Sequence, residues 1–105
     1  MDQQPKILVL GSLNMDLVVK SLRLPKKGET IMGDSFNTTP GGKGANQAVA
    51  ASKMGAHSKM IGRVGDDLFG KQLISYLNSQ NVNTDSITID TDSHSGIAII
   101  NVDSA

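Results

Sequence analysis

Apolar residues along the chain follow two different spacings, one typical of strands and one typical of helices. Residues 6–13 (KILVLGSL) contain a continuous apolar run that ends in small polar residues, which is typical of a strand buried on both faces. Shorter runs rich in β-branched residues predict further strands. These strands are expected at residues 15–20, 29–37, 58–65, 86–90 and 96–102.

Two segments have the spacing of helices. Residues 44–54 are rich in alanine, and Gly55 follows them in the position of a helix C-cap. Residues 66–80 place apolar side chains on one stripe, with Asp66 or Asp67 as the N-cap. Strands that alternate with helices of this length are connected by βαβ crossovers. The chain is therefore expected to be an α/β protein with a parallel sheet and helices on its faces.

Composition and charge exclude several classes of function. Ten Lys plus Arg residues balance ten Asp plus Glu residues among 105, so the chain offers no basic surface to nucleic acid or to an anionic membrane. The chain has no cysteine, which excludes disulfides and thiolate metal sites. No apolar run is long enough for a signal peptide or a membrane span. We expect a single cytoplasmic globular unit that binds neither nucleic acid nor membrane.

The last predicted strand, residues 96–102, is followed by no segment that could pair with it. Bare strand edges are normally covered in folded proteins. We therefore expect the sequence to be a fragment or a truncated form of a longer protein.

The segment TTPGGKGANQ, residues 38–47, places three glycines and a lysine directly before the first predicted helix. Its spacing matches neither GxxxxGK[ST] nor GxGxxG, the two common phosphate-binding loops. The glycines indicate a backbone that turns through positive φ or closely approaches a neighbour, and the helix amides favour an oxygen-rich ligand. Lys43 opposes the helix dipole, and such a ligand would offset that cost. A tight strand-to-helix turn with a solvated lysine explains the same glycines equally well.

A second group of polar residues follows the first predicted strand, in the segment GSLNMD. Asn14 and Asp16 lie on the same side of an extended chain, and ligands of open α/β sheets bind beyond the carboxyl ends of the strands. Both side chains could therefore hydrogen-bond a polyol. Asn and Asp are also common turn residues, and these two residues taken alone favour a turn.

Four motifs, in this order and spacing, resemble the ribokinase branch of the PfkB-type carbohydrate kinases: GSLNMD, PKKGET, GGKGANQAVAASKMGA and GRVGDDLFG. The resemblance implies that residues 1–105 form the N-terminal part of a three-layer α/β/α sandwich with a small β-sheet lid. The lid strands would be residues 15–20, 29–37 and 96–102. The resemblance also implies that eight residues line a pentose site. These are Asn14, Met15, Asp16, Gly42, Lys43, Gly44, Ala45 and Asn46.

The activity implied by the resemblance is transfer of the γ-phosphoryl group of ATP to the 5-hydroxyl of D-ribose, giving ribose 5-phosphate and ADP. ATP and Mg²⁺ are the implied cofactors, with a monovalent cation such as K⁺ as a further candidate, and the implied assembly is a homodimer joined through the lid. The family's catalytic Asp, its GAGD anion hole and its ATP and cation sites match no segment here. No catalytic or metal-binding residue is therefore assigned, and the 105-residue chain alone is expected to be inactive.

Alternative functions remain open within the family and outside it. Fructokinase, deoxyribokinase and nucleoside kinase are the enzyme alternatives, although an aromatic content of 3% leaves few side chains to stack on a nucleobase. The alternative of another class is a non-catalytic module that binds sugar or dimerises. Exposed strand edges make such a module the second choice.

Overall fold

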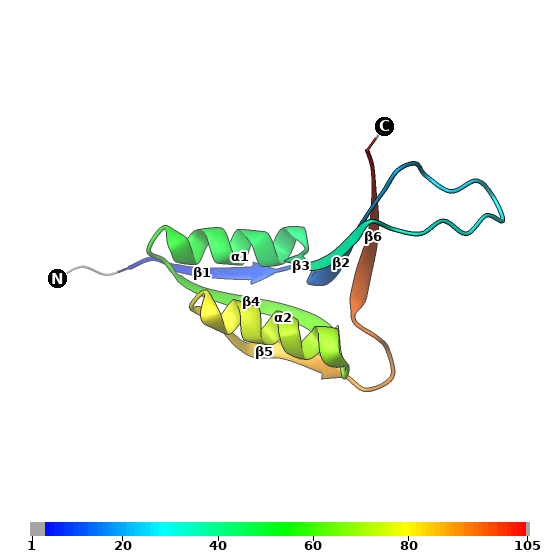
Figure 1. Cartoon of the computed structure of the whole chain (residues 1–105). Coiled ribbons are helices and arrows are strands. Elements are labelled where there is room, and N and C mark those ends of the chain that lie inside the picture. Colours follow the sequence, from blue (N-terminus) through cyan, green and yellow to red (C-terminus); the bar gives the residue numbers. More distant parts are fainter. Residues whose placement is uncertain (1–3, 105) are drawn as a thin grey trace.

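The computed structural model describes residues 4–104, which form two small sheets and two helices (Figure 1). The molecule is elongated, with extents of 60 × 33 × 18 Å, because one sheet projects from the end of the other (Figure 1). The core sheet consists of β1 (Lys6–Leu10), β4 (His57–Gly65) and β5 (Val82–Asp90). All three strands are parallel, in the order β1-β4-β5.

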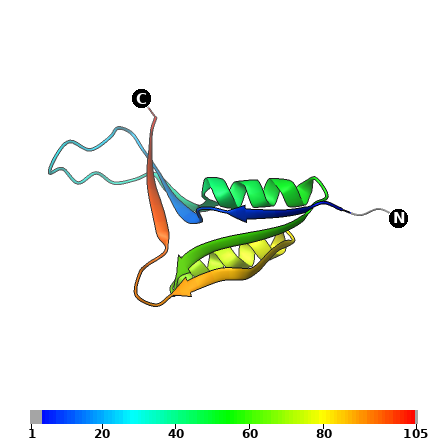
Figure 2. The same cartoon turned by 180° about the vertical axis from the view of Figure 1, so that it is seen from behind.

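The crossovers between the core strands run through α1 (Lys43–Lys53) and α2 (Leu68–Ser79), and both helices cover the same face of the core sheet (Figures 1 and 2). Among residues 4–104 nothing covers the other face, where Leu8 and Leu10 are 60% and 79% exposed. The predicted parallel α/β arrangement is confirmed. The expectation of helices on both faces holds for one face of the described chain.

The hydrophobic core lies between the two helices and the core sheet. Met60, Leu73 and Leu77 are at most 1% exposed, and burial of each such side chain contributes roughly 1.5–3 kcal/mol. Leu13 and Met15 belong to the same cluster although they lie outside the core sheet. A continuous core therefore reaches from the helices to the base of the second sheet.

Local sequence explains where the helices begin and end. The residue Gly55, with φ 97°, follows the last turn of α1 and confirms the predicted C-cap region. The side chain of Asp67 accepts a hydrogen bond from the Gly70 N–H at 2.8 Å, so Asp67 is the N-cap of α2. Neither helix has the length and apolar character needed to cross a membrane.

The second sheet, which we call the lid sheet, consists of β2 (Asn14–Ser21), β3 (Ser35–Gly41) and β6 (Gly96–Asp103). The central strand β2 pairs with β3 in the antiparallel direction and with β6 in the parallel direction. The strands predicted at 15–20 and 96–102 are confirmed. The strand predicted at 29–37 is wrong over residues 29–34, because β3 begins at Ser35.

Two features keep residues 29–34 out of the sheet. In the register of β2 and β3, these residues would pair with the segment beyond Ser21, and Pro25 in that segment has no N–H to donate. The guanidinium of Arg23 instead donates two hydrogen bonds to the Glu29 carboxylate, at 2.6 and 2.9 Å. The ion pair closes an extended loop between the strands (Figure 1).

Candidate functional site

The core sheet and the lid sheet are joined where two connections lie against each other. Residues 11–13 lead from β1 to β2, and Gly42 leads from β3 to α1. The Ala45 N–H donates to the Ser12 carbonyl oxygen at 3.0 Å, and the Asn46 N–H donates to the Gly42 carbonyl oxygen at 2.9 Å. We call the contact between residues 11–13 and residues 41–44 the glycine junction.

Glycine is required at the junction by close backbone contact. Gly42 has φ 100° and ψ 133°, a conformation that other residues rarely adopt. A Cβ there would also lie 2.5 Å from the Ser12 carbonyl oxygen. A Cβ on Gly44 would lie 2.8 Å from the Gly11 Cα. Close packing is therefore sufficient to require glycine at positions 42 and 44. Any ligand binding at the junction would depend on the side chains beside it.

Asn14 and Asp16 are brought to the glycine junction by strand pairing. Asn14 is the register partner of Gly41, and its side-chain amide donates to an Asp16 carboxylate oxygen at 2.7 Å. A Cβ on Gly41 would lie 2.7 Å from the other Asp16 carboxylate oxygen, so the carboxylate lies directly over Gly41. Both residues are half-buried and lie within β2, which excludes the turn that these two residues alone favoured.

The predicted pentose-site residues separate into two groups by burial. Lys43 and Asn46 lie in the first turn of α1 with exposed side chains, at the end of the helix that meets β2 and β3 (Figure 1). No acidic residue lies in this turn, and Gly42 offers no side chain to cap it. Met15 and Ala45 are 1% and 4% exposed, and their side chains belong to the hydrophobic core. These two side chains therefore pack into the core beneath the polar residues and are not available to contact a ligand.

A polar face results from this arrangement. A carboxylate, two amides and an ammonium group lie on or beside the glycine junction, together with the amino end of α1. All of these groups donate or accept hydrogen bonds, which suits a ligand rich in hydroxyl groups. The four side chains are Asn14, Asp16, Lys43 and Asn46.

The third connection between the sheets, from β5 to β6, meets the core at a different place. The Asp67 carboxylate accepts hydrogen bonds from the Ser95 N–H and the Ser95 hydroxyl, both at 2.7 Å. These two bonds, together with the bond from the Gly70 N–H, hold the pKa of Asp67 below its ordinary value, and the charge of His94 acts in the same direction. We call the contact of Asp67 with Ser95 the carboxylate junction. Sequence reasoning found the cap but missed Ser95, since a single serine in a loop carries no pattern.

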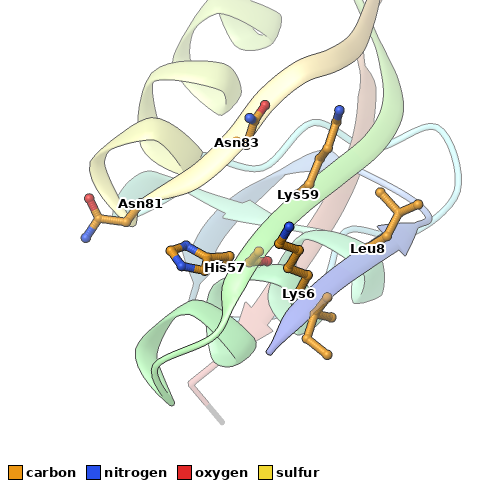
Figure 3. A pocket seen from close by; sticks show the side chains of 8 residues that line it. Lys6, Leu8, His57, Lys59, Asn81 and Asn83 are labelled. Atoms are coloured by element: carbon orange, nitrogen blue, oxygen red, sulfur yellow. The ribbon is translucent and has the colours of Figure 1, made fainter. Parts of the chain in front are cut away.

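Other parts of the described chain offer less chemistry. Among residues 4–104 no three His, Cys, Asp or Glu side chains are grouped so that they could hold a metal ion. A hollow of about 420 Å³ lies at the amino-terminal edge of the core sheet, where Lys6, His57 and Lys59 point toward it (Figure 3). The strands of the core sheet are parallel, so this hollow lies at the opposite edge from the glycine junction.

Comparison with protein families gives one match over almost the whole chain. Residues 4–105 match the family model described as pfkB family carbohydrate kinase. A protein described as ribokinase from Bacillus subtilis is 52% identical over 94 residues, which cover 90% of this chain and 32% of the relative. A ribokinase from Schizosaccharomyces pombe is 46% identical over 103 residues, covering 92% of this chain and 32% of the relative.

Solved structures of similar proteins have the same fold. The structure of Arabidopsis thaliana ribokinase complexed with ribose and ATP superposes with a TM-score of 0.90 at 36% identity, over 97% of this chain and 33% of that one. Ribokinase from Cryptococcus neoformans in complex with ADP gives a TM-score of 0.82 at 35% identity, over 96% of this chain and 32% of that one. These likenesses confirm the predicted ribokinase-like α/β fold. The chain spans about a third of the length of these relatives.

Proposed function

The chain belongs to the pfkB family of carbohydrate kinases, and from that membership we propose that it supplies the sugar-binding half and the lid of an ATP-dependent ribokinase. The reaction is transfer of the γ-phosphoryl group of ATP to the 5-hydroxyl of D-ribose, which gives ribose 5-phosphate and ADP. In this proposal residues 1–105 are the N-terminal part of the kinase domain, with the lid strands inserted into the α/β core. The names of the relatives support the substrate, since several are ribokinases.

One observation supports the proposal: the pairing of β2 with β3 brings two polar motifs that are distant in sequence next to each other. Asn14 lies opposite Gly41, and the Asp16 carboxylate lies over the same glycine. The motif at residues 14–16 and the motif at residues 42–46 therefore lie next to each other at the carboxyl edge of the core sheet, and we propose that they bind one sugar. Ligands of open α/β sheets bind at this edge.

Each predicted site residue has a role in this proposal. The Asp16 carboxylate accepts hydrogen bonds from two sugar hydroxyls, and the bond from Asn14 fixes its orientation. Lys43 and Asn46 donate to hydroxyl oxygens from the first turn of α1. Gly42 and Gly44 let the backbone approach residues 11–13 closely and so bring the two motifs together, while Met15 and Ala45 hold the strand and the helix in place from the core.

The cofactors of the proposed reaction are ATP and Mg²⁺, with a monovalent cation such as K⁺ as a candidate activator. Related structures are described with ATP or ADP bound, which supports the nucleotide. The residues described here do not fit a Mg²⁺ or K⁺ site formed by side chains, because no three acidic or histidine side chains lie together among residues 4–104. The phosphoryl-transfer groups would therefore come from the part of the relatives that this chain does not span.

The lid sheet would cover the bound sugar and exclude water from the transfer step, which suppresses hydrolysis of ATP. We further propose that two lids pair in a homodimer. One face of the lid sheet carries Phe36, Ile97 and Ile99, which are 62%, 45% and 68% exposed. An apolar face of this kind would be buried against a second lid. A cytoplasmic location and the absence of nucleic-acid or membrane partners complete the proposal.

Deoxyribokinase is the second candidate function. A deoxyribokinase from Salmonella typhi is 42% identical over 94 residues, covering 90% of this chain and 31% of the relative. The two activities differ in one hydroxyl of the sugar. A pentose site that hydrogen-bonds this hydroxyl rejects the deoxy sugar, because the buried polar groups would lose their partner.

Calorimetric titration of the 105-residue chain with D-ribose tests the proposal, with 2-deoxy-D-ribose, D-fructose and adenosine titrated in parallel. D-Ribose should bind best, and Asp16→Asn should weaken its binding about 10- to 100-fold, because a hydrogen bond to a charged group is lost. Asp34→Asn is the matched control, since Asp34 is an exposed carboxylate in the loop that joins β2 to β3. Tighter binding of the deoxy sugar would favour the second candidate. A folded chain that binds no pentose would contradict the proposed sugar site.

A further inference from the structure

The strand β6 is the part of the lid sheet that comes last in the chain, and the loop before it is hydrogen-bonded to the core through Ser95. Residues 91–95 connect it to β5, and Ser95 is the residue directly before β6. Ser95 is 1% exposed, although the residues around it in the loop are exposed or half-exposed. A buried serine in such a loop requires partners for all of its polar groups.

Asp67 supplies most of those partners. One Asp67 carboxylate oxygen accepts from the Ser95 N–H at 2.7 Å, and the other accepts from the Ser95 hydroxyl at 2.7 Å. The Ser95 hydroxyl oxygen in turn accepts from the Gly65 N–H at 3.0 Å. The end of β4, the start of α2 and the start of β6 therefore meet in one hydrogen-bonded group.

The backbone of the core lies in close contact with this group. A Cβ on Gly65 would lie 2.5 Å from the Ser95 nitrogen and 2.5 Å from the Ser93 carbonyl oxygen. A Cβ on Gly70 would lie 3.0 Å from the Ser95 hydroxyl oxygen and would collide with the Gly65 carbonyl oxygen. The loop before β6 is therefore seated directly on the backbone of the core.

The position of Ser95 determines where β6 enters the lid sheet. Gly96 follows Ser95 directly and is the register partner of Asn14, and a Cβ on Gly96 would lie 3.4 Å from the Asn14 Cβ. Two residues further along, Ala98 is the register partner of Asp16. A shift of Ser95 would therefore shift the strand that lies beside both polar side chains of the proposed sugar site.

We infer that Asp67 is a positioning residue for the sugar site: its carboxylate fixes Ser95 and so holds β6 in register beside Asn14 and Asp16. This inference rests on the proposed function, because it assigns Asp67 a part in the geometry of that site. Asp67 makes no hydrogen bond to Asn14 or Asp16, and its effect passes through Ser95 and the parallel pairing of β2 with β6.

Two roles of Asp67 must be separated in the test, because the same carboxylate also caps α2. Asp67→Ser keeps a good N-cap, since serine caps helices about as well as aspartate, but one short hydroxyl cannot reach both groups of Ser95. Ser95→Ala removes the hydroxyl and leaves the cap untouched. Asp66→Ser is the matched control, because Asp66 is exposed and its side chain makes no hydrogen bond within residues 4–104.

Amide hydrogen exchange of the 105-residue chain, resolved by NMR, measures the consequence without any ligand. Asp67→Ser and Ser95→Ala should each speed exchange in β6 about 10-fold or more, and Asp66→Ser should change nothing. Exchange in α2 and β4 should change less than about 3-fold, except at the Gly65 N–H, which loses its acceptor in Ser95→Ala. Equal acceleration throughout the chain would overturn the inference, because Asp67 would then be only a structural cap. Unchanged exchange in β6 would overturn it as well.

Titration of the same variants with D-ribose then tests the link to the site. Where the unmodified chain binds D-ribose, both variants should bind it several-fold more weakly, and unchanged affinity alongside faster exchange in β6 would overturn the positioning role. Where the unmodified chain binds no pentose, the proposed function fails. The exchange data then still decide whether Asp67 holds β6 in register.

Discussion

The two junctions between the core and the lid solve the same problem with different chemistry. At the glycine junction the two connections meet backbone to backbone, and Gly42 and Gly44 contribute no side chains to the contact. At the carboxylate junction one side chain, Asp67, accepts two hydrogen bonds from Ser95 in the connection before β6 and one from Gly70 in α2. One junction is held by shape and the other by charge and hydrogen bonding.

The difference indicates which junction is available for binding. Backbone packing at the glycine junction leaves Asn14, Asp16 and Lys43 free to face a ligand, because none of them is needed to hold the junction together. Both oxygens of the Asp67 carboxylate already accept hydrogen bonds within the fold, so that carboxylate is suited to positioning rather than to binding.

Substitution at Gly42 should break the glycine junction and have the largest effect on stability. Gly42→Ala adds strain at φ 100° and a clash with the backbone of Ser12, so we expect a loss of about 2–5 kcal/mol in the free energy of unfolding. Gly28→Ala is the matched control, because Gly28 has φ 75° but a Cβ added there would meet no neighbouring atom within 4 Å. That variant should lose at most about 1–2 kcal/mol.

Urea denaturation of the two glycine variants separates the cost of positive φ from the cost of the steric clash with Ser12. A clearly larger loss for Gly42→Ala than for Gly28→Ala is the expected result. Equal losses would mean that positive φ alone requires glycine at both positions, and the close backbone contact at the glycine junction would then have no energetic weight.

Acid should weaken the carboxylate junction selectively. The pKa of Asp67 is lowered in the folded chain by the Ser95 N–H, the Ser95 hydroxyl and the Gly70 N–H, with His94 as the charged neighbour. A group with a lowered folded pKa stabilises the fold above its unfolded pKa of about 4, and this stabilisation is lost as pH falls through the folded pKa. The stability difference between the unmodified chain and Asp67→Asn should therefore be constant from about pH 5 to pH 7 and shrink below about pH 4.

Thermal unfolding of both proteins across this pH range measures the difference directly. Asp90 and Glu29 also have lowered pKa values, so the stability of each protein alone falls in acid for several reasons. The difference in stability between the two proteins reports the contribution of Asp67 alone. A difference that persists unchanged at pH 3 would show that the charge of Asp67 has no part in the junction.

Substitution of Lys43 should have the smallest effect on stability. Lys43→Ala should stabilise the fold, although it should weaken sugar binding. Lys43→Ala removes a cation from the amino end of α1, where it opposes the helix dipole, so the free energy of unfolding should rise by about 0.3–1 kcal/mol. Lys53→Ala removes a cation from the last turn and should lower it by a similar amount. Chemical denaturation measures both. A loss of stability in Lys43→Ala would mean that this lysine helps to hold the glycine junction together.

The helices and strands of the core could be predicted from sequence because each buries one apolar face, which gives a regular spacing of apolar residues. The strand at β1, both helices and the cap at Asp67 follow from apolar spacing and from capping chemistry. The strand β3 was misplaced because it is an edge strand whose residues are mostly exposed, so no alternation of apolar and polar residues marks it. Pro40 within it also argues against a strand, although an edge position tolerates proline.

The candidate site could be predicted only in parts. The polar residues of each motif were identified, but their meeting depends on the register of β2 against β3, which places Asn14 opposite Gly41. The pattern within either strand does not give this register. Ser95 was missed for the same reason, since its role depends on a partner 28 residues away.

The most direct test of the shared site is NMR of the isotopically labelled chain during titration with D-ribose. The two motifs lie apart in the sequence and meet only through the pairing of β2 with β3. We predict that the amide signals of residues 14–16 and 42–46 shift together, with a single dissociation constant, and that those around Lys6 and His57 in the distant hollow do not. Shifts confined to one motif, or centred on that hollow, would contradict the claim that the glycine junction and β2 form one sugar site.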